Sequence, residues 1–223
     1  MTELHERVVR VACAGLPPGV AREAYFRRLP LLEAEGLARP AVLRKWQKVG
    51  AHTALVRLDR LDLAASAWQE LVEAYDALQA EALVLQTAPS FSPSTSNREA
   101  FKRFMGDVVG DPGDRVLCWE PRGTWEPFQA ARLCQELGLV HAFDPLLPEP
   151  GEEGSTLPPT EEAYYRIYGL GLQRNRVSDE KLAELAERVA QNARAWVVFA
   201  SADRWKDAQR FAALWSAFAA EAE

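Results

Sequence analysis

Short apolar runs alternate with longer segments of helical period along almost the whole chain. Runs rich in valine, leucine and aromatic residues predict buried β-strands, and apolar residues at every third or fourth position predict amphipathic helices. The predicted strands cover residues 10–14, 29–33, 53–58, 82–86, 115–120, 139–144, 164–168 and 195–200. Eight strands separated by helices predict an α/β fold, a parallel (β/α)8 barrel of the TIM type.

Serine and threonine residues mark the expected starts of three helices. Ser96, followed by Glu99, predicts a capping box, because each side chain can satisfy a free amide of the first turn. Thr124 and Ser178 are the expected N-caps of two later helices.

The connection from Pro145 to Pro159 interrupts the alternation with five prolines and three acidic residues. Because proline cannot donate a helical hydrogen bond, a loop is expected here in place of the sixth helix. Two interpretations stay open for this loop, a lid over a site and a solvated surface connector. The pattern continues unchanged on both sides, so one domain over residues 1–223 is predicted.

An open, doubly wound sheet is the alternative fold. It is less favoured because the residues after the first strand, CAGLPPG, lack the GxGxxG pattern that binds dinucleotide phosphates.

Composition restricts the possible partners. The formal net charge of -6 and the isoelectric point near 5.3 disfavour a nucleic-acid-binding surface, which needs many basic residues. The three cysteines form no CxxC pair, so neither a disulfide nor a zinc site is expected. No apolar stretch reaches the length of a membrane span or a signal core, so a soluble, cytoplasmic protein is expected. The sequence does not indicate an oligomeric state.

Polar residues gather at the carboxyl ends of the predicted strands. In a barrel these ends surround one mouth, where side chains that perform chemistry are usually found. Arg57 and Arg166 lie within strand patterns, and an arginine there must be paired if it is buried. The candidate site residues are Glu33, Gln86, Glu120, Arg122, Asp144, Arg166 and Tyr168.

The stretch VLCWEPRGTWEPF, residues 116–128, shows the pattern most clearly. Pro121 disfavours helical backbone angles at Glu120, which keeps this residue extended at the end of its strand. Gly123 then permits the turn into the next helix. The strand end therefore presents a carboxylate together with the guanidinium of Arg122. Either a functional site or an ion pair that closes the end of the barrel fits this arrangement.

No metal site or cofactor is predicted. His5 lies in the terminus, His52 in a turn and His141 on the helix-facing side of a strand, so they do not converge. Two or three carboxylates holding a magnesium ion loosely stay an open alternative. Cys13 has no identifiable base beside it and is expected to be a buried structural residue.

Four segments together resemble the YecE-like family, a domain of unknown function also called DUF72. They are QTAPSF at 86–91, WEPR at 119–122 with Trp125 and Asp144 after it, YRIYG at 165–169, and WVVF at 196–199. The family's counterparts are Gln-x-Pro-Pro-Ser-Phe, Glu-x-Arg followed by Ser-Trp, Tyr-Val-Arg-Leu-His-Gly, and an aromatic strand ending in Phe-Asn-Asn. The resemblance implies a TIM-type barrel and no particular activity, because the family has no settled one.

The chain departs from the family pattern at the mouth and near its start. Tyr168 stands where the family has histidine, and Ala200 with Ser201 replaces a pair of asparagines. The loss of the histidine removes the most useful general base near neutral pH. The chain thus resembles a shortened, divergent member.

These features predict a barrel that binds a small anionic molecule, bearing phosphate or carboxylate and sugar-like in character. Arg122 and Arg166 would clamp the anion, and Glu120 and Asp144 would act as acid and base in a metal-independent hydrolase or lyase reaction. Gln86, Glu33 and Tyr168 would complete the ligand contacts. A non-catalytic binding or interaction protein is the first alternative, and endonuclease-like processing of nucleic acid is a third.

Overall fold

The computed structural model describes residues 7–35, 38–58, 65–147, 157, 160–169 and 176–222, apart from the side chains of residues 65–67, 221 and 222. In this part of the chain eight parallel strands follow one another in sequence order, β1 to β8, in a closed barrel. Seven α-helices and one π-helical segment accompany them. The predicted TIM-type α/β fold is therefore confirmed. Every strand end lies within two residues of its predicted position.

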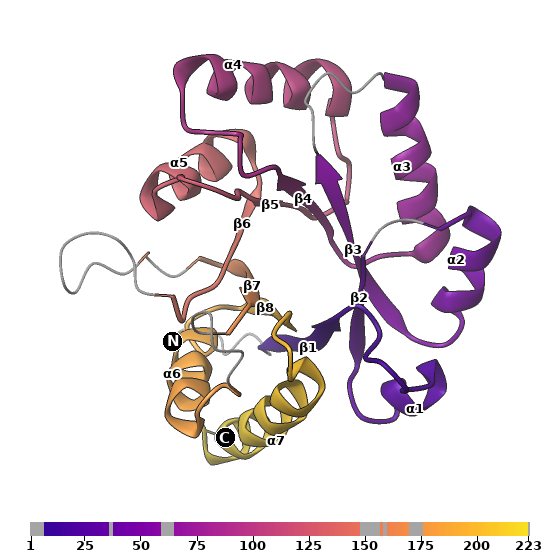
Figure 1. Cartoon of the computed structure of the whole chain (residues 1–223), viewed down its shortest axis with the longest axis vertical. Helices are drawn as coiled ribbons and strands as arrows, with labels where there is room; N and C mark the ends of the chain where they lie inside the picture. Colours follow the sequence, from indigo (N-terminus) through magenta and orange to yellow (C-terminus); the bar gives the residue numbers. More distant parts are fainter. Residues whose placement is uncertain are drawn as a thin grey trace, which may run out of the picture. The chain divides into compact units, whose positions relative to one another are not determined.

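The chain divides into two compact units, residues 1–32 with 143–223 and residues 33–142. In the first unit β8 pairs in parallel with β1 on one side and with β7 on the other. Helices α6 and α7 contact each other, and α7 packs against β1 and β8 (Figure 1). The elements of this unit are β1 (Val8–Ala14), α1 (Arg22–Phe26), β7 (Glu162–Ile167), α6 (Asp179–Val189), β8 (Arg194–Phe199) and α7 (Arg204–Ala222).

In the second unit β4 pairs with β3 and β5, and β5 pairs with β6. Helices α2 and α3 lie against each other beside β3 (Figure 1). The unit boundaries fall inside β2 (Leu31–Glu35) and β6 (Val140–Phe143). The other elements are α2 (Pro40–Gln47), β3 (Ala51–Leu58), α3 (Ala65–Leu78), β4 (Leu83–Thr87), α4 (Thr95–Arg103), the π-helical η1 (Phe104–Val109), β5 (Leu117–Glu120) and α5 (Pro127–Leu137).

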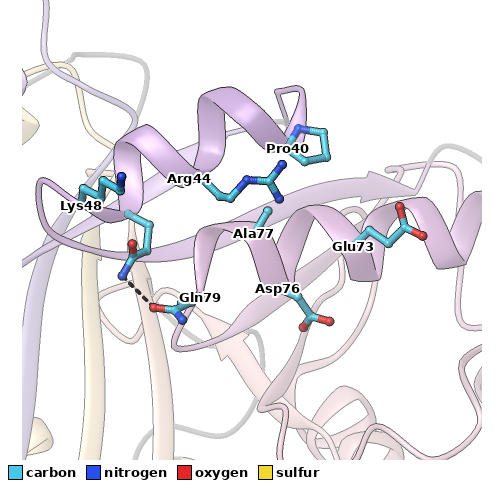
Figure 2. Close-up of a pocket in the computed structure, with 8 residues that line it drawn as sticks. Pro40, Arg44, Lys48, Glu73, Asp76, Ala77 and Gln79 are labelled. Atoms are coloured by element: carbon cyan, nitrogen blue, oxygen red, sulfur yellow. Dashed lines mark hydrogen bonds between the residues drawn. The ribbon is translucent and has the colours of Figure 1, made fainter.

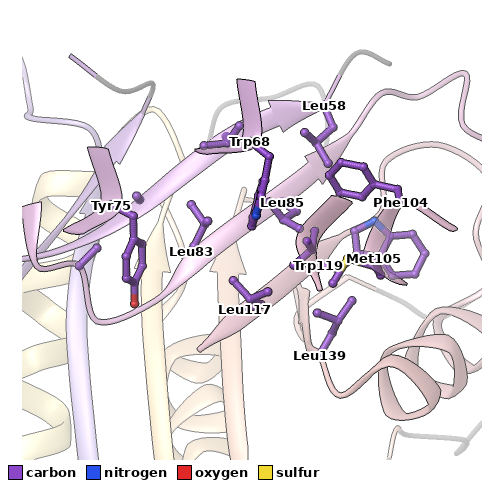
Figure 3. Close-up of a cluster of buried hydrophobic side chains, with 14 of the residues drawn as sticks. Leu58, Trp68, Tyr75, Leu83, Leu85, Phe104, Met105, Leu117, Trp119 and Leu139 are labelled. Carbon is purple, nitrogen blue, oxygen red and sulfur yellow. The ribbon is translucent and has the colours of Figure 1, made fainter. Parts of the chain in front are cut away.

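The core of the second unit is built from alternate strand residues and from the inner faces of its helices. Leu83 and Leu85 of β4 and Trp119 of β5 are fully buried in it, together with aromatic residues of α3 and η1 (Figure 3). Burying a large apolar side chain stabilises the fold by about 1.5–3 kcal/mol relative to exposure. Because side chains alternate along a strand, Val84, Gln86 and the other intervening residues lie on the face opposite this core.

Of the predicted N-caps for α6 and α4, the structure confirms the first and not the second. Ser178 is the N-cap of α6, as predicted, and its hydroxyl accepts a hydrogen bond from the third residue beyond it. The capping box at Ser96 is wrong. Ser94 is the N-cap of α4 and accepts from the amide of Asn97 at 3.2 Å, so Ser96 lies inside the first turn.

The prediction for Thr124 is also wrong. Helix α5 begins later, with Glu126 as N-cap and Pro127 at the first helical position. Proline suits that position because it has no amide to satisfy and its φ angle already matches the helix.

The connection between β6 and β7 is described only at residues 144–147, 157 and 160–161, where it forms turns and no helix. The rest of the proline-rich segment, on which the lid interpretation depends, lies outside the described residues. Within the part of the chain that is described, no helix is long and apolar enough to cross a membrane.

Candidate functional site

A row of polar side chains crosses three neighbouring strands near their carboxyl ends. Arg57 of β3 is in register with Gln86 of β4, and Gln86 is in register with Glu120 of β5. Residues paired in register on parallel strands project from the same face of a sheet. Their sequence neighbours Leu58, Leu85 and Trp119 belong to the hydrophobic core, so the row lies on the other face.

The carboxylate of Glu120 is the centre of this row. Its residue is only 3% exposed, and the side-chain amide of Gln86 donates to Oε2 at 2.7 Å. A guanidinium nitrogen of Arg122 lies 3.4 Å from Oε1, while the Arg122 side chain is 40% exposed. A buried carboxylate thus stands next to a guanidinium that reaches solvent. The predicted association of Glu120, Arg122 and Gln86 is present in this unit.

The loop between β5 and α5 holds Arg122 in place. Gly123 has a φ angle of +93°, and a Cβ atom there would lie 2.3 Å from the carbonyl oxygen of Pro89. The indole nitrogen of Trp125 donates to the carbonyl of Phe91. The loop after β5 therefore packs directly on the loop after β4, which limits the positions open to Arg122.

Trp119 stabilises the same strand end from the core side. Its indole nitrogen donates to the hydroxyl of Thr87 at 3.2 Å, and its ring lies 4.7 Å from Phe101 and 4.9 Å from Trp125, centroid to centroid. Trp119 therefore helps to fix the backbone next to Glu120.

Glu33 and Arg57 differ sharply in exposure. Glu33 of β2 is fully buried, and alternation places it on the face opposite Ala34, which belongs to the core. Arg57 is exposed. The sequence predicts that Arg57 lies near a strand end, but it does not predict the register of Arg57 with Gln86. Arg57 is therefore absent from the predicted site residues.

The first unit holds a second polar group, made of Asp144, Arg166 and Tyr168. The two oxygens of Asp144 accept the backbone amides of Leu146 and Tyr168, at 3.0 and 2.8 Å. A guanidinium nitrogen of Arg166 donates to the hydroxyl of Tyr168, and its carbon lies 5.0 Å from the centre of that ring. The three predicted residues are thus brought together within this unit.

Aliphatic residues lie beside Arg166 on the neighbouring strands of the first unit. It is in register with Val198 of β8, which is in register with Ala12 of β1. Arg166 itself is only 3% exposed. Tyr165 and Ile167 pack in the hydrophobic core, so the side chains of β7 alternate and Arg166 lies on the opposite face of the strand.

Burial keeps Cys13, Cys134 and His141 in their neutral forms near neutral pH. Burial raises the pKa of the Cys13 thiol to about 12 and also raises the pKa of Cys134, so both stay protonated near neutral pH. Burial lowers the pKa of His141 to about 4. Among the residues described, no group of three or more potential metal ligands is found.

An open groove of about 650 Å³ lies between α2 and α3, away from the strand-end residues. Arg44 of α2 and Lys48, which follows α2, line it together with Glu73 and Asp76 of α3 (Figure 2). Arg115 binds the carboxylate of Asp76 with two nitrogens at 2.9–3.2 Å. The groove carries both signs of charge and none of the predicted site residues.

Comparisons with known proteins identify similar structures. No protein-family model matches the chain, and no curated protein matches it. A crystal structure of a DUF72 family protein from Enterococcus faecalis V583 aligns with a TM-score of 0.68 and 14% identity, covering 94% of this chain and 98% of that one. The fold is similar to that of a DUF72 protein. This agrees with the resemblance seen in the four sequence segments.

Two further structures show the same architecture. A second structure of the E. faecalis DUF72 protein gives a TM-score of 0.67 at 13% identity, over 94% and 96% of the two chains. A xylose isomerase domain containing protein from Salmonella typhimurium LT2 gives 0.61 at 15% identity, over 94% and 97%. At these identities the similarity establishes a shared barrel fold, and chemistry does not follow from a fold alone.

Proposed function

We propose that this protein binds a small anionic ligand at the carboxyl ends of its strands, with Arg122 as one of the ligand contacts. The ligand would carry phosphate or carboxylate and be sugar-like in character. The observation that carries the proposal is the half-exposed guanidinium of Arg122 beside the buried carboxylate of Glu120, which Gln86 holds at 2.7 Å.

Physical chemistry favours a ligand at this position over a purely structural ion pair. A guanidinium has five N–H donors, and the 3.4 Å approach of one of its nitrogens to Glu120 is long for a charged hydrogen bond. The exposed part of the Arg122 side chain can therefore offer donors to a molecule from solvent. Packing of Gly123 against Pro89 fixes the loop, so little ordering is needed when a ligand binds.

The second polar group is proposed as a further set of ligand contacts, considered in its own unit. Arg166 would supply a guanidinium and Tyr168 a hydroxyl. Glu33, buried on β2, is proposed as a ligand contact on the same grounds of strand-end position. Because Arg166 is buried, its replacement would disturb folding, so Arg122 provides the cleaner test.

A catalytic version of the proposal assigns acid and base roles to Glu120 and Asp144, in a hydrolase or lyase reaction that uses these side chains alone. Glu120 is the stronger candidate of the two, because it contacts Gln86 and Arg122, whose side chains can rearrange around a ligand. Asp144 accepts one backbone amide on each oxygen, which gives it a structural task as well.

Non-catalytic binding is the second candidate function. It is favoured by those backbone contacts of Asp144 and by Tyr168, which stands where histidine would be the natural general base. Ligand turnover separates the two candidates: a bound compound that is recovered unchanged after long incubation supports binding alone.

The proposal is tested by thermal shift and calorimetric titration of the wild-type chain with inorganic phosphate, sugar phosphates, carboxylated sugars, nucleotides and short single-stranded DNA. We expect a small anionic compound to bind, and Arg122→Gln to weaken it by about tenfold or more, the value of a charged hydrogen bond. Arg132→Gln, at an exposed arginine of α5, is the matched control and should bind as the wild type does.

Two results would contradict the proposal. One is the absence of binding by every anionic compound of the panel to the wild type. The other is equal affinity of Arg122→Gln and Arg132→Gln.

A further inference from the structure

Arg57 lies at one end of the row, and its charge is not balanced by a neighbour in the described part of the chain. It is exposed, and no hydrogen bond or ion pair of its side chain is found among the described residues. Arg122, in contrast, lies 3.4 Å from the carboxylate of Glu120. As far as the described residues show, the positive charge at Arg57 is therefore less compensated than that at Arg122, and a negative group from solvent is attracted to Arg57.

The geometry of the sheet sets the distance between the two ends of the row. Arg57, Gln86 and Glu120 occupy three successive strands in register, so their Cα atoms are spread over two strand spacings. Each spacing is about 4.8 Å, which puts Arg57 and Glu120 about 9–10 Å apart at the backbone. The two ends can contact different parts of one small molecule.

The Glu120 end of the row offers both donors and acceptors. A carboxylate accepts hydrogen bonds, while an amide and a guanidinium donate them. The charges of Glu120 and Arg122 largely compensate each other at 3.4 Å. Such a set matches hydroxyl groups, each of which is both a donor and an acceptor, better than it matches a second anion.

We infer that the ligand is a polyhydroxylated molecule with one terminal anionic group. Arg57 binds the phosphate or carboxylate, and Gln86, Glu120 and Arg122 bind hydroxyl groups at the other end. A sugar phosphate or a sugar acid has this chemistry. The inference rests on the proposed function, because it takes an anionic ligand as given, and it names Arg57 as the residue that determines specificity for the charge.

The test compares glucose 6-phosphate, glucose and inorganic phosphate by calorimetric titration. The wild type should bind glucose 6-phosphate more tightly than either fragment, and its affinity should fall as salt is raised, since charge attraction is screened. Arg57→Gln should lower the affinity for glucose 6-phosphate about tenfold to a hundredfold and remove most of the salt dependence. Arg132→Gln should change neither.

A second variant guards against a general effect on folding. Arg57→Lys retains the charge and should recover part of the affinity, whereas loss through misfolding would not be rescued. A wild type that binds a sugar phosphate, with Arg57→Gln binding equally well, overturns this inference and leaves the proposed function standing. Tighter binding of a compound with anions at both ends also overturns it. If no anionic compound binds the wild type, the proposed function itself fails.

Discussion

Glu120 combines burial with contacts to two side chains that can donate hydrogen bonds. A carboxylate in such a place costs desolvation free energy, which its partners offset only in part. Proteins retain such groups where they perform a task or where a replacement would leave a donor unsatisfied. The two explanations predict different effects of a neutral, isosteric substitution.

Replacing Glu120 with glutamine should change the free energy of unfolding by no more than about 1 kcal/mol, because the lost ion pair is offset by the removal of a buried charge. The affinity for the anionic ligand should fall more than tenfold at the same time. Urea denaturation and titration measure the two quantities, and Glu187→Gln, at an exposed position of α6, serves as control. A loss of about 3 kcal/mol with unchanged affinity would show that Glu120 is a scaffold residue.

His141 gives a pH dependence with a defined sign. Its pKa in the folded protein is lowered to about 4 by burial, compared with about 6.5 in an unfolded chain. Between these values the unfolded state binds more protons, so the contribution of His141 to stability is present above pH 6.5 and is lost progressively towards pH 4.

His141→Gln should therefore show a flatter decline of the free energy of unfolding between pH 6.5 and pH 4. The difference between variant and wild type across this window should approach about 3 kcal/mol. Chemical denaturation at several pH values checks this, and because both proteins share all other titrating groups, the difference isolates His141. Parallel curves would contradict the expected pKa.

Neighbouring residues were sufficient to predict that Glu120 and Arg122 lie together, because Pro121 constrains the backbone between them. The part played by Arg57 depends on the register of two strands distant in sequence, which side-chain alternation alone does not determine.

At the scale of single elements, the β5–α5 loop shows how tightly a site residue is held. Gly123 combines a φ angle of +93° with an approach to Pro89 that leaves no room for a Cβ atom. Gly113 also has a positive φ, +61°, but a Cβ atom there would meet nothing within 4 Å. A comparison of substitutions at the two glycines therefore distinguishes backbone strain, which both positions have, from steric overlap, which only Gly123 has.

Gly123→Ala should lower the free energy of unfolding by more than Gly113→Ala does. Strain in the left-handed region costs about 1–3 kcal/mol, and only the first variant adds a clash with Pro89. It should also weaken ligand binding, since displacement of the loop moves Arg122. Urea denaturation of the two variants measures the comparison, and equal losses would mean that the loop adjusts without cost.

Helix α4 supplies a test of its cap. Ser94→Ala should destabilise the protein by about 1 kcal/mol, because the hydroxyl of Ser94 satisfies the amide of Asn97. Ser96→Ala should have a much smaller effect, although its hydroxyl lies 3.1 Å from that of Ser94. Thermal and urea denaturation of both variants decide whether the cap is at 94, and a larger loss for Ser96→Ala would place it at 96.

The strands were more predictable than the helix starts. Each strand is a run of mainly apolar residues, because a barrel strand packs on both its inner face and its helix-covered face. All eight strands lie within two residues of their predicted ends. The cap of α4 lies in a stretch with serine at 92, 94 and 96, so several residues could satisfy the same amides. Local capping rules cannot choose among equivalent side chains without the helix packing.

For the whole molecule, the alternation of strands and helices was enough to predict a closed α/β barrel, and structures of DUF72 and xylose isomerase domain containing proteins share that fold. The substrate could not be predicted, because barrels of one architecture support many reactions. The side chains at the strand ends are the only guide. The net charge of -6 agrees with a small ligand better than with a polyanion.

NMR can show directly whether the row on β3, β4 and β5 is a ligand site. The side-chain Nε–Hε signals of the arginines, assigned through Arg57→Gln and Arg122→Gln, are followed while glucose 6-phosphate is added. We expect the signals of Arg57 and Arg122 to shift along one saturating curve, while the signal of Arg132 stays in place. Binding that leaves the signals of Arg57 and Arg122 unchanged would contradict it.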